Sequence, residues 1–344
     1  MRRKLSDAVV VLTGASSGIG RATAQHFADK GATLVLAARD ASALEETARE
    51  CRERGATALA VTTDVSREQE VNALAQRALD SFGRIDIWIN NAAVCAFGRI
   101  DEVPIDVIHR VIETNLMGYV YGTRAALAHM RPRGRGTIIF IDSIVTSSPQ
   151  PYTGAYVISK AGIRSLSDCL RMELLLEDNP DIDICSIMPE SIDTPLFHQA
   201  ANYTGRAIQT LRPLHSPHTV AREIVRMAER PRRTAFAGTT ARWIAALHTM
   251  VPWIYERFVA RHIYRNLLMD KPAPPTEGNL YHPMPEHTSV TGGWREHHGT
   301  SIGKLALAGA ALAIPVALWG LANRTRHLPP ARGLPHPRRY VEQR

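Results

Sequence analysis

Cysteine is scarce in this sequence, and none of it lies in a metal-binding arrangement. The 344 residues include four cysteines, with no Cys-x-x-Cys pair and no His/Cys cluster at the spacing of metal ligands. They are Cys51, Cys95, Cys169 and Cys185. Because a zinc site or a disulfide framework needs such clustering, we predict no metal and no disulfides, which suits a reducing compartment.

The start of the chain is not predicted to be a secretion signal. Met1 to Lys4 is basic, but the apolar run Ala8 to Leu12 is shorter than a signal-peptide core and leads straight into a glycine-rich turn. We therefore interpret this run as a strand and expect a cytoplasmic catalytic domain.

Residues 1 to 240 carry almost no excess charge. They hold 28 Lys or Arg against 27 Asp or Glu, whereas the rest of the chain holds 13 against 6, so most of the net charge of +8 lies in the C-terminal part. A basic tail beside an apolar run favours an anionic membrane surface as a partner. We predict no nucleic-acid partner.

The first strand is followed by a turn rich in glycine. Thr13 to Gly20 reads Thr-Gly-Ala-Ser-Ser-Gly-Ile-Gly and precedes the amphipathic run Ala22 to Ala28. Gly14 permits a sharp turn, Gly18 lets the backbone approach a ligand, and Gly20 allows helix and strand to pack closely. The helix N-terminus would bind a pyrophosphate. Three glycines at a strand end also suit an ordinary tight connection, so the turn alone does not distinguish a dinucleotide site from a structural turn.

Apolar strands and helical patterns alternate along the chain. Strands are predicted at Ala8–Leu12, Thr33–Ala37, Ala58–Thr62, Ile85–Ile89, Thr137–Ile141 and Ile182–Ile187. Helices are predicted at Ala22–Ala28, Ala43–Arg54, Glu68–Phe82, Ile105–Met130, Tyr152–Glu177 and Val220–Glu229. This alternation predicts an α/β fold with a doubly wound parallel sheet, the Rossmann fold, whose ligand lies at the carboxyl ends of the strands.

Polar residues at two places indicate the chemistry of that ligand site. Arg39 follows the second strand, where an arginine suits the 2′-phosphate of NADP(H) better than the 2′-hydroxyl of NAD(H); a solvated surface arginine is the alternative. Tyr156 and Lys160 share one helix face, preceded by Ser143. A nearby ammonium lowers a phenol pKa, so Tyr156 could exchange a proton with a substrate oxygen. Taken alone, the Tyr-x-x-x-Lys spacing is also common on exposed helices.

The combination of these motifs resembles the short-chain dehydrogenase/reductase family. The matching residues are Thr13-Gly14-x-x-x-Gly18-x-Gly20, Asp64, Asn90-Asn91-Ala92, Asn115, Ser143 and Tyr156-x-x-x-Lys160. The resemblance covers about residues 5 to 240. Its glycine spacing is similar to that of the single-domain oxidoreductases of the family. It implies hydride transfer between a nicotinamide and a carbonyl carbon.

The resemblance also implies residue roles. Tyr156 would be the general acid/base, Ser143 would orient and polarise the carbonyl, Lys160 would lower the pKa of Tyr156 and contact the nicotinamide ribose, and Asn115 would hold a water in the proton relay. The implied cofactor contacts are Gly14, Ser16, Ser17, Gly18, Ile19, Gly20, Asp64, Val65, Asn91, Ala92 and Thr194, together with Tyr156 and Lys160. A homodimer or homotetramer through the long helices at 105–130 and 152–177 is implied as well.

One position departs from the family pattern. Pro189 is followed by Glu190 where the family commonly has glycine. Glutamate restricts the backbone, and we expect its side chain to face solvent, as most glutamates do. Glu190 is the sole support for an alternative interpretation, a catalytically silent, membrane-associated NADP-binding scaffold.

The substrate is expected to be hydrophobic. Apolar residues in and near the variable segment Pro195 to Pro217 could line an apolar pocket for a lipid-like or steroid-like ketone or secondary alcohol. They are Val94, Phe97, Ile144, Leu196, Phe197, Ile208 and Leu211. Ordinary core packing would use the same residues.

The catalytic domain, residues 1–240, is expected to be followed by an extension. We predict an amphipathic helix at 241–270 interrupted by Pro252, an irregular linker at 271–304, and an apolar segment with a basic tail at 305–344. Residues 305–322 include no charged side chain and would extend about 27 Å as a helix, close to the thickness of a bilayer core. A peripheral or partly inserted membrane anchor is expected; a span with a translocated tail is the alternative.

Overall fold

Seven parallel strands form the central sheet of this computed structural model, which describes residues 4–177, 181–238, 245 and 248–295. Their spatial order is β10-β7-β6-β4-β1-β2-β3. The bounds are β1 Val9–Thr13, β2 Thr33–Ala38, β3 Ala58–Thr62, β4 Ile87–Asn90, β6 Gly136–Ile141, β7 Ile182–Pro189 and β10 Thr234–Ala237. The predicted Rossmann fold is confirmed, and the edge strand β10 is an addition that the sequence analysis missed.

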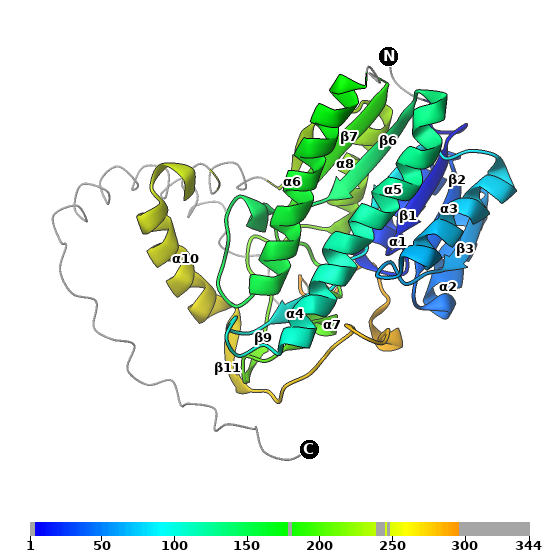
Figure 1. Cartoon of the computed structure of the whole chain (residues 1–344). Helices are drawn as coiled ribbons and strands as arrows, with labels where there is room; N and C mark the ends of the chain where they lie inside the picture. Colours follow the sequence, from blue (N-terminus) through cyan, green and yellow to red (C-terminus); the bar gives the residue numbers. More distant parts are fainter. Residues whose placement is uncertain (1–3, 178–180, 239–244, 246–247, 296–344) are drawn as a thin grey trace. The chain divides into compact units, whose positions relative to one another are not determined.

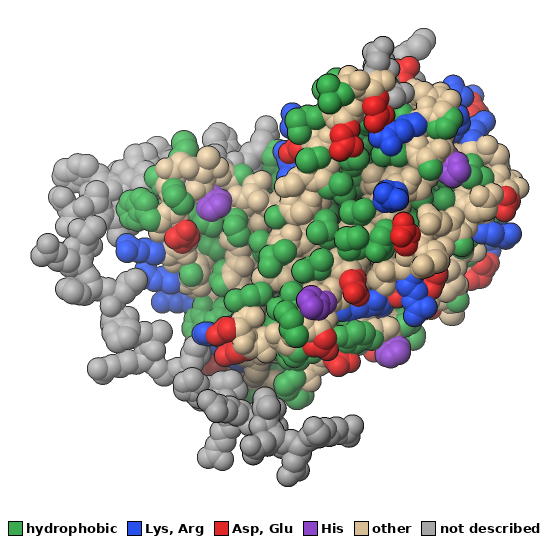
Figure 2. Space-filling view, viewed as in Figure 1, with side chains coloured by type: hydrophobic (Ala, Val, Ile, Leu, Met, Phe, Trp, Pro, Cys, Tyr) green, Lys and Arg blue, Asp and Glu red, His purple; other side chains and the backbone are tan. Residues whose placement is uncertain are grey.

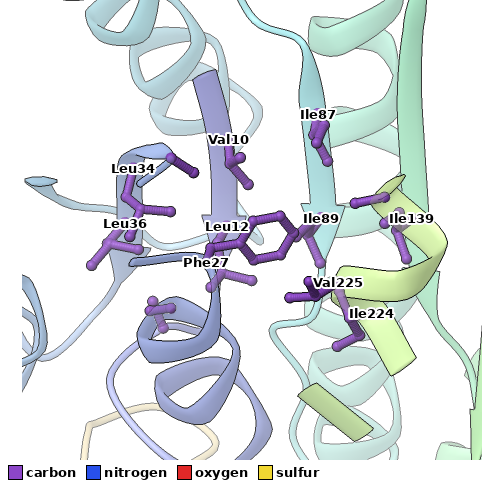
Figure 3. Packing of buried hydrophobic residues seen from close by; sticks show 14 of the residues in the cluster. Val10, Leu12, Phe27, Leu34, Leu36, Ile87, Ile89, Ile139, Ile224 and Val225 are labelled. Atoms are coloured by element: carbon purple, nitrogen blue, oxygen red, sulfur yellow. The ribbon is translucent and has the colours of Figure 1, made fainter. Parts of the chain in front are cut away.

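Helices cover both faces of this sheet (Figure 1). On one face, a cluster of buried hydrophobic side chains joins the sheet to three helices, which are α1 Gly18–Ala28, α2 Ala41–Glu53 and α8 Pro217–Glu229. The opposite core contains α3 Glu68–Phe82, α5 Gly118–Met130 and α6 Gly154–Leu176, with α4 Ile105–Ile112 beside α6. Because side chains alternate along a strand, Val10 and Leu12 face α1 and α8 (Figure 3), whereas Val9 and Val11 belong to the other cluster.

The order of the strands in the sheet determines where the ligand crevice lies. β1 lies between β4 and β2, so the chain winds in opposite directions on the two sides of β1. A crevice opens beyond the carboxyl ends of strands at such a switch point. The glycine turn follows β1, and Asn91 follows β4, so both are positioned at this crevice.

The helix expected over 105–130 contains a π-helical turn. Glu113–Met117 separates α4 from α5 and includes the fully buried Asn115. Single π turns within α-helices are frequent at functional sites, because the extra residue changes the direction of a side chain. Here the turn directs Asn115 toward the loop after β4.

The extension pairs with the core. α10 Pro252–Asn266 begins at the proline expected to interrupt it, a position where proline needs no hydrogen-bond donor. It leads to β11 Leu268–Pro272, which is antiparallel to β9 Arg206–Ile208. Shorter elements are β5 Ala96–Phe97, paired with β8 Ala201–Asn202, then α7 Leu196–Gln199 and the 3-10 turns Arg131–Arg133, Ile144–Thr146 and Pro285–His287. By packing, the first compact unit runs from Met1 to Arg295. The predicted domain boundary at residue 240 stays a prediction.

In the described part of the chain, no helix is both long and apolar enough to cross a bilayer. The apolar segment at 305–322 lies outside the described residues, as does the basic tail.

Candidate active site

A cleft of about 280 Å³ opens at the carboxyl ends of the central strands. The sequence-predicted site residues line it, with the exception of Asn115. They come from the glycine turn, from the ends of β2, β3, β4 and β6, and from α6 and the segment after β7. The lining set is Gly14, Ser16, Ser17, Gly18, Ile19, Gly20, Arg39, Asp64, Val65, Asn91, Ala92, Ser143, Tyr156, Lys160 and Thr194.

The glycine turn fits a dinucleotide. Gly14 and Gly18 have φ values of 67° and 53°, which side chains rarely adopt. A Cβ on Gly20 would lie 1.9 Å from the Gly14 carbonyl oxygen, so this glycine permits close packing within the turn, as expected. Helix α1 has no side-chain cap at Ser17 and no acidic residue in its first turn. Its N-terminal dipole therefore suits an anion such as a pyrophosphate.

Asn91 and Ala92 hold the turn in place. The Asn91 side chain donates to the carbonyl oxygens of Thr13 and Gly14, at 2.8 and 3.0 Å. The backbone N–H groups of Asn91 and Ala92 both donate to the Thr13 hydroxyl, at 3.0 and 3.2 Å. These bonds tie the end of β4 to the end of β1 and fix the shape of the crevice.

Asp64, after β3, is fixed by an ion pair. Its carboxylate accepts from Arg110 at 2.8 Å and from the Ser66 hydroxyl at 2.8 Å. Burial alone would raise the pKa of Asp64, but these hydrogen bonds hold it below its usual value. The charged carboxylate thus stays at the expected adenine edge of the cleft, with Val65 next to it.

Arg39 is not a solvated surface side chain. Its guanidinium donates to the carbonyl oxygens of Asn279 and Leu280 at 2.5 and 2.9 Å. Burial lowers the pKa of Arg39 from its ordinary value. Arg39 therefore lines the cleft, as expected, while also holding a segment of the extension that the sequence analysis did not connect with the site.

Ser143 and Tyr156 are close to one another at the end of β6. Ser143 precedes the 3-10 turn Ile144–Thr146 and accepts from the Val145 N–H at 3.3 Å. A hydrogen bond with Ser143 lowers the pKa of Tyr156, but burial outweighs it and raises that pKa above 10.0. Burial therefore dominates the pKa of Tyr156. The Lys160 ammonium lies over the Tyr156 ring, 5.6 Å from its centroid, and its expected lowering of the Tyr156 pKa stays a prediction.

Lys160 is buried and donates to the Ile141 carbonyl oxygen at 2.6 Å. Burial lowers its pKa from 10.5 to about 8, although the charge of Asp142 acts in the opposite direction. Burial also raises the pKa of Asp142 from 3.8 to about 6, opposed by Lys160. The sequence analysis missed Asp142; its position directly before Ser143 was the only available signal.

Asn115 lies behind the cleft. Its amide oxygen accepts from the Val94 N–H at 2.8 Å, and its amide nitrogen donates to the Val94 carbonyl oxygen at 2.9 Å and to the Ser159 hydroxyl at 3.1 Å. The side chain thus connects the loop after β4 to α6, the helix of Tyr156. Its part in a proton relay stays a prediction.

Glu190 does not face solvent, which corrects the sequence-based expectation. Its side chain is 5% exposed and accepts from His215 Nε2 at 3.0 Å. It fills the space over Gly238, where a Cβ would lie 2.1 Å from the Glu190 carboxyl carbon. Glycine at position 238 has no side chain that would compete for this space, so the glutamate is accommodated in the wall of the cleft.

The apolar end of the cleft combines expected and unexpected residues. Those expected and found in its lining are Val94, Phe97, Ile144, Leu196, Phe197 and Leu211, whereas Ile208 packs in the adjacent cluster. That cluster also includes Val259, Ile263 and Leu267 from the α10 region, next to Tyr156. Other lining residues that the sequence analysis missed are Gln150, Thr153, Gln199, Asn279, Pro283, Met284 and Thr288.

The fold and cleft together define a Rossmann-fold oxidoreductase. A family model described as short chain dehydrogenase matches residues 8–204. The chain therefore belongs to the short-chain dehydrogenase/reductase family.

Relatives and solved structures agree with this membership. The chain is 34% identical over 331 residues to "Uncharacterized oxidoreductase YxnA" of Bacillus subtilis, covering 94% of this chain and 93% of the relative. It is 32% identical to 11-beta-hydroxysteroid dehydrogenase A of Sesamum indicum, over 72% of this chain and 74% of the relative. An alcohol dehydrogenase from Thermococcus sibiricus, solved with 5-hydroxy-NADP, superimposes with a TM-score of 0.58 at 29% identity, covering 67% of this chain and 95% of that one.

A second structural neighbour was solved with the other nicotinamide cofactor. This short-chain dehydrogenase/reductase from Burkholderia phymatum, in complex with NAD, has a TM-score of 0.67 at 25% identity and covers 74% of this chain and 97% of that one. Because one neighbour holds an NADP analogue and the other NAD, their ligands do not distinguish the two cofactors for this chain.

Proposed function

We propose that this protein is an NADP(H)-dependent oxidoreductase that interconverts a hydrophobic carbonyl compound and the corresponding secondary alcohol. The observation that carries the proposal is the placement of Ser143, Tyr156 and Lys160 in one cleft with the glycine turn. Consumption of NADPH by the full-length protein in the presence of a panel of ketones, followed by absorbance, tests it. Turnover of small charged substrates alone would contradict the hydrophobic preference.

Each residue of the proposed site has a task in reduction. The nicotinamide, when bound, supplies the hydride that reaches the carbonyl carbon. Ser143 donates a hydrogen bond to the carbonyl oxygen and orients it. Tyr156, in contact with Ser143, delivers the proton to that oxygen, and the raised pKa keeps this proton in place until negative charge develops there. Lys160 holds a positive charge at the ring of Tyr156 that favours the phenolate after proton transfer.

The pH dependence of turnover should report Lys160. Its ammonium is lost as the pH rises through about 8, so kcat/KM should fall on that alkaline side. Asp142→Asn removes the negative charge that raises the Lys160 pKa. We expect this variant to shift the alkaline limb to lower pH by roughly one unit. Profiles of kcat/KM for both proteins between pH 5 and 10 measure the shift. If the alkaline limb does not move in the variant, the observed ionisation is not that of Lys160.

Arg39 supports the preference for NADP(H). It lines the cleft at the end of β2 and has three further N–H groups besides the two that bind carbonyl oxygens. For Arg39→Ala we expect NADPH to bind about tenfold to a hundredfold more weakly, since a charged hydrogen bond to phosphate is lost. NADH binding should change much less. Fluorescence titration with both cofactors measures the two affinities. Equal losses of affinity for NADPH and NADH would mean that Arg39 only supports the structure of the site.

The proposed oligomer would use the long helices. α4 and α6 expose several large apolar side chains, and hydrophobic groups are visible over the face formed by α4, α5 and α6 (Figure 2). They are Ile105, Ile158, Met172, Leu175 and Leu176. A homodimer or homotetramer through these helices would cover them. The helices in question are those expected at 105–130 and 152–177.

Peripheral membrane association is the second part of the proposal. α10 exposes Trp253 and Phe258, and Arg257 lies 5.9 Å from the Trp253 ring centroid. Aromatic and arginine side chains together suit the interface of an anionic bilayer. The full-length protein should sediment with phosphatidylserine vesicles at low salt and be released at high salt. Recovery in the supernatant at low salt would contradict this part of the proposal.

A further inference from the structure

An irregular segment of the extension lines part of the cleft. Residues 276–295, called the strap below, follow β11 and include the 3-10 turn Pro285–His287 (Figure 1, orange). At its first end, Leu280 is fully buried in a cluster with Val107 and Val111 of α4. The Leu280 carbonyl oxygen accepts from both Arg39, at 2.9 Å, and Arg110, at 3.0 Å.

The middle of the strap lies on the glycine turn. The Gly18 N–H donates to the Ser289 carbonyl oxygen at 3.0 Å. One residue earlier, the Thr288 carbonyl oxygen accepts from Arg21 at 3.0 Å, and Arg21 is itself buried between Glu46 and Glu50. The strap is therefore held directly against the proposed pyrophosphate site.

The last part of the strap is fixed where the nicotinamide half would bind. Asp193 accepts from the backbone N–H groups of Gly292 and Trp294 at 3.1 and 3.0 Å. The Trp294 indole donates to the Thr194 carbonyl oxygen at 3.2 Å and stacks on His198, with ring centroids 4.2 Å apart. The strap thus reaches the adenosine, pyrophosphate and nicotinamide parts of the proposed site.

One polar group of the strap is buried, lines the cleft and has no partner among the described residues. Asn279 is 8% exposed, and its side-chain Oδ1 accepts no hydrogen bond there. The Asn279 amide nitrogen donates to Gln199 at 3.1 Å, which fixes the orientation of the side chain. A buried acceptor of this kind is costly unless a donor reaches it. The Asn279 backbone carbonyl accepts from Arg39, so this residue lies at the end of the cleft where the adenosine ribose is expected.

We propose that the strap is the outer wall of the cofactor site and that Asn279 Oδ1 accepts a hydrogen bond from a hydroxyl of the adenosine ribose. The inference rests on the proposed function, since it requires a dinucleotide in the cleft. The cofactor is enclosed between the strand ends and the strap. Exchange of the cofactor therefore requires the strap to separate from Asp193 and Thr194, which makes both binding and release slow.

Two variants separate the hydrogen bond from the enclosure. Asn279→Ala removes the acceptor and leaves the backbone contacts of the strap, so NADPH release should become about threefold to tenfold faster with association unchanged. Trp294→Ala removes the stacking on His198 and the bond to Thr194, so association and release should both become faster. Trp253→Ala is the matched control, because Trp253 is 46% exposed on α10 and lies outside the strap and outside the described lining of the cleft. Its rates should equal those of the wild type.

The rates are measured on the full chain by stopped-flow fluorescence, with bound NADPH displaced by excess NADP⁺. Hydrogen exchange provides a readout independent of catalysis: NADPH should slow exchange in peptides from 276–295 of the wild type. Unchanged rates in both Asn279→Ala and Trp294→Ala, together with no protection of the strap, would overturn the inference. Failure of the wild type to bind NADPH or NADH at all would instead overturn the proposed function.

Discussion

Tyr156→Phe should reduce turnover by about a hundredfold to ten-thousandfold while NADPH still binds. The change removes one oxygen atom, and with it the proton that the reduced carbonyl oxygen must receive. The ring remains in its cluster beside Phe97 and Leu196, so the apolar wall of the cleft is preserved. Steady-state rates of NADPH oxidation and fluorescence titration of the cofactor measure the two properties separately.

Tyr121→Phe serves as the control for this variant. Tyr121 is a partly buried tyrosine of the helical layer, packed against the core that includes Trp88 and Tyr119, and it is absent from the described lining of the cleft. Its replacement should leave turnover within about twofold of the wild type, as for most substitutions away from a site. Equal activity of Tyr156→Phe and the wild type would refute the role of Tyr156 in proton transfer.

Gly20→Ala should destabilise the fold by about 3 kcal/mol or more and abolish cofactor binding in any protein that still folds. The added Cβ would meet the Gly14 carbonyl oxygen at 1.9 Å and the Asn91 amide nitrogen at 2.8 Å. Gly14 lies in the turn after β1 and Asn91 follows β4, and hydrogen bonds join the two, so relieving the overlap would disrupt the turn. Urea denaturation measures the stability, and NADPH titration of the folded fraction measures binding.

Gly55→Ala is the matched control for a glycine substitution. Gly55 has a φ of 86°, but a Cβ there would meet nothing within 4 Å. Its replacement should therefore cost only the backbone strain of a left-handed residue, about 1 to 2 kcal/mol, and leave NADPH binding unchanged. A loss for Gly20→Ala no greater than that for Gly55→Ala would contradict the close packing described for the turn.

Much of the fold was predictable because it depends on local patterns. The strand predicted over Ala58–Thr62 and the helix predicted over Glu68–Phe82 agree with the structure. An apolar run and a 3.6-residue period can both be recognised from residues that are near one another in the sequence. The glycine turn was also predictable from the sequence, because glycine is the usual residue where the backbone has a positive φ or lies very close to other atoms. Strand β10 was missed because it is a short edge strand whose pairing with β7 is not visible in local sequence.

The composition of the site was less predictable where distant segments meet. The contact between Arg39 and Leu280 joins residues 241 positions apart, and no local pattern indicates it. The strap has no helical or strand period, so the sequence indicated only an irregular linker. The environment of Glu190 depends on the absence of a side chain at Gly238 and on the position of His215. The raised pKa of Tyr156 similarly follows from burial, which spacing alone does not report.

The most direct test of the account is the transfer of deuterium from NADPH labelled at nicotinamide C4 to a hydrophobic ketone. The account predicts that the wild type places deuterium on the carbinol carbon of the product, as detected by mass spectrometry, and that Tyr156→Phe forms almost none of this labelled alcohol. Product alcohol without deuterium, or labelled alcohol formed equally by Tyr156→Phe, would contradict hydride transfer in the cleft with Tyr156 as the proton donor.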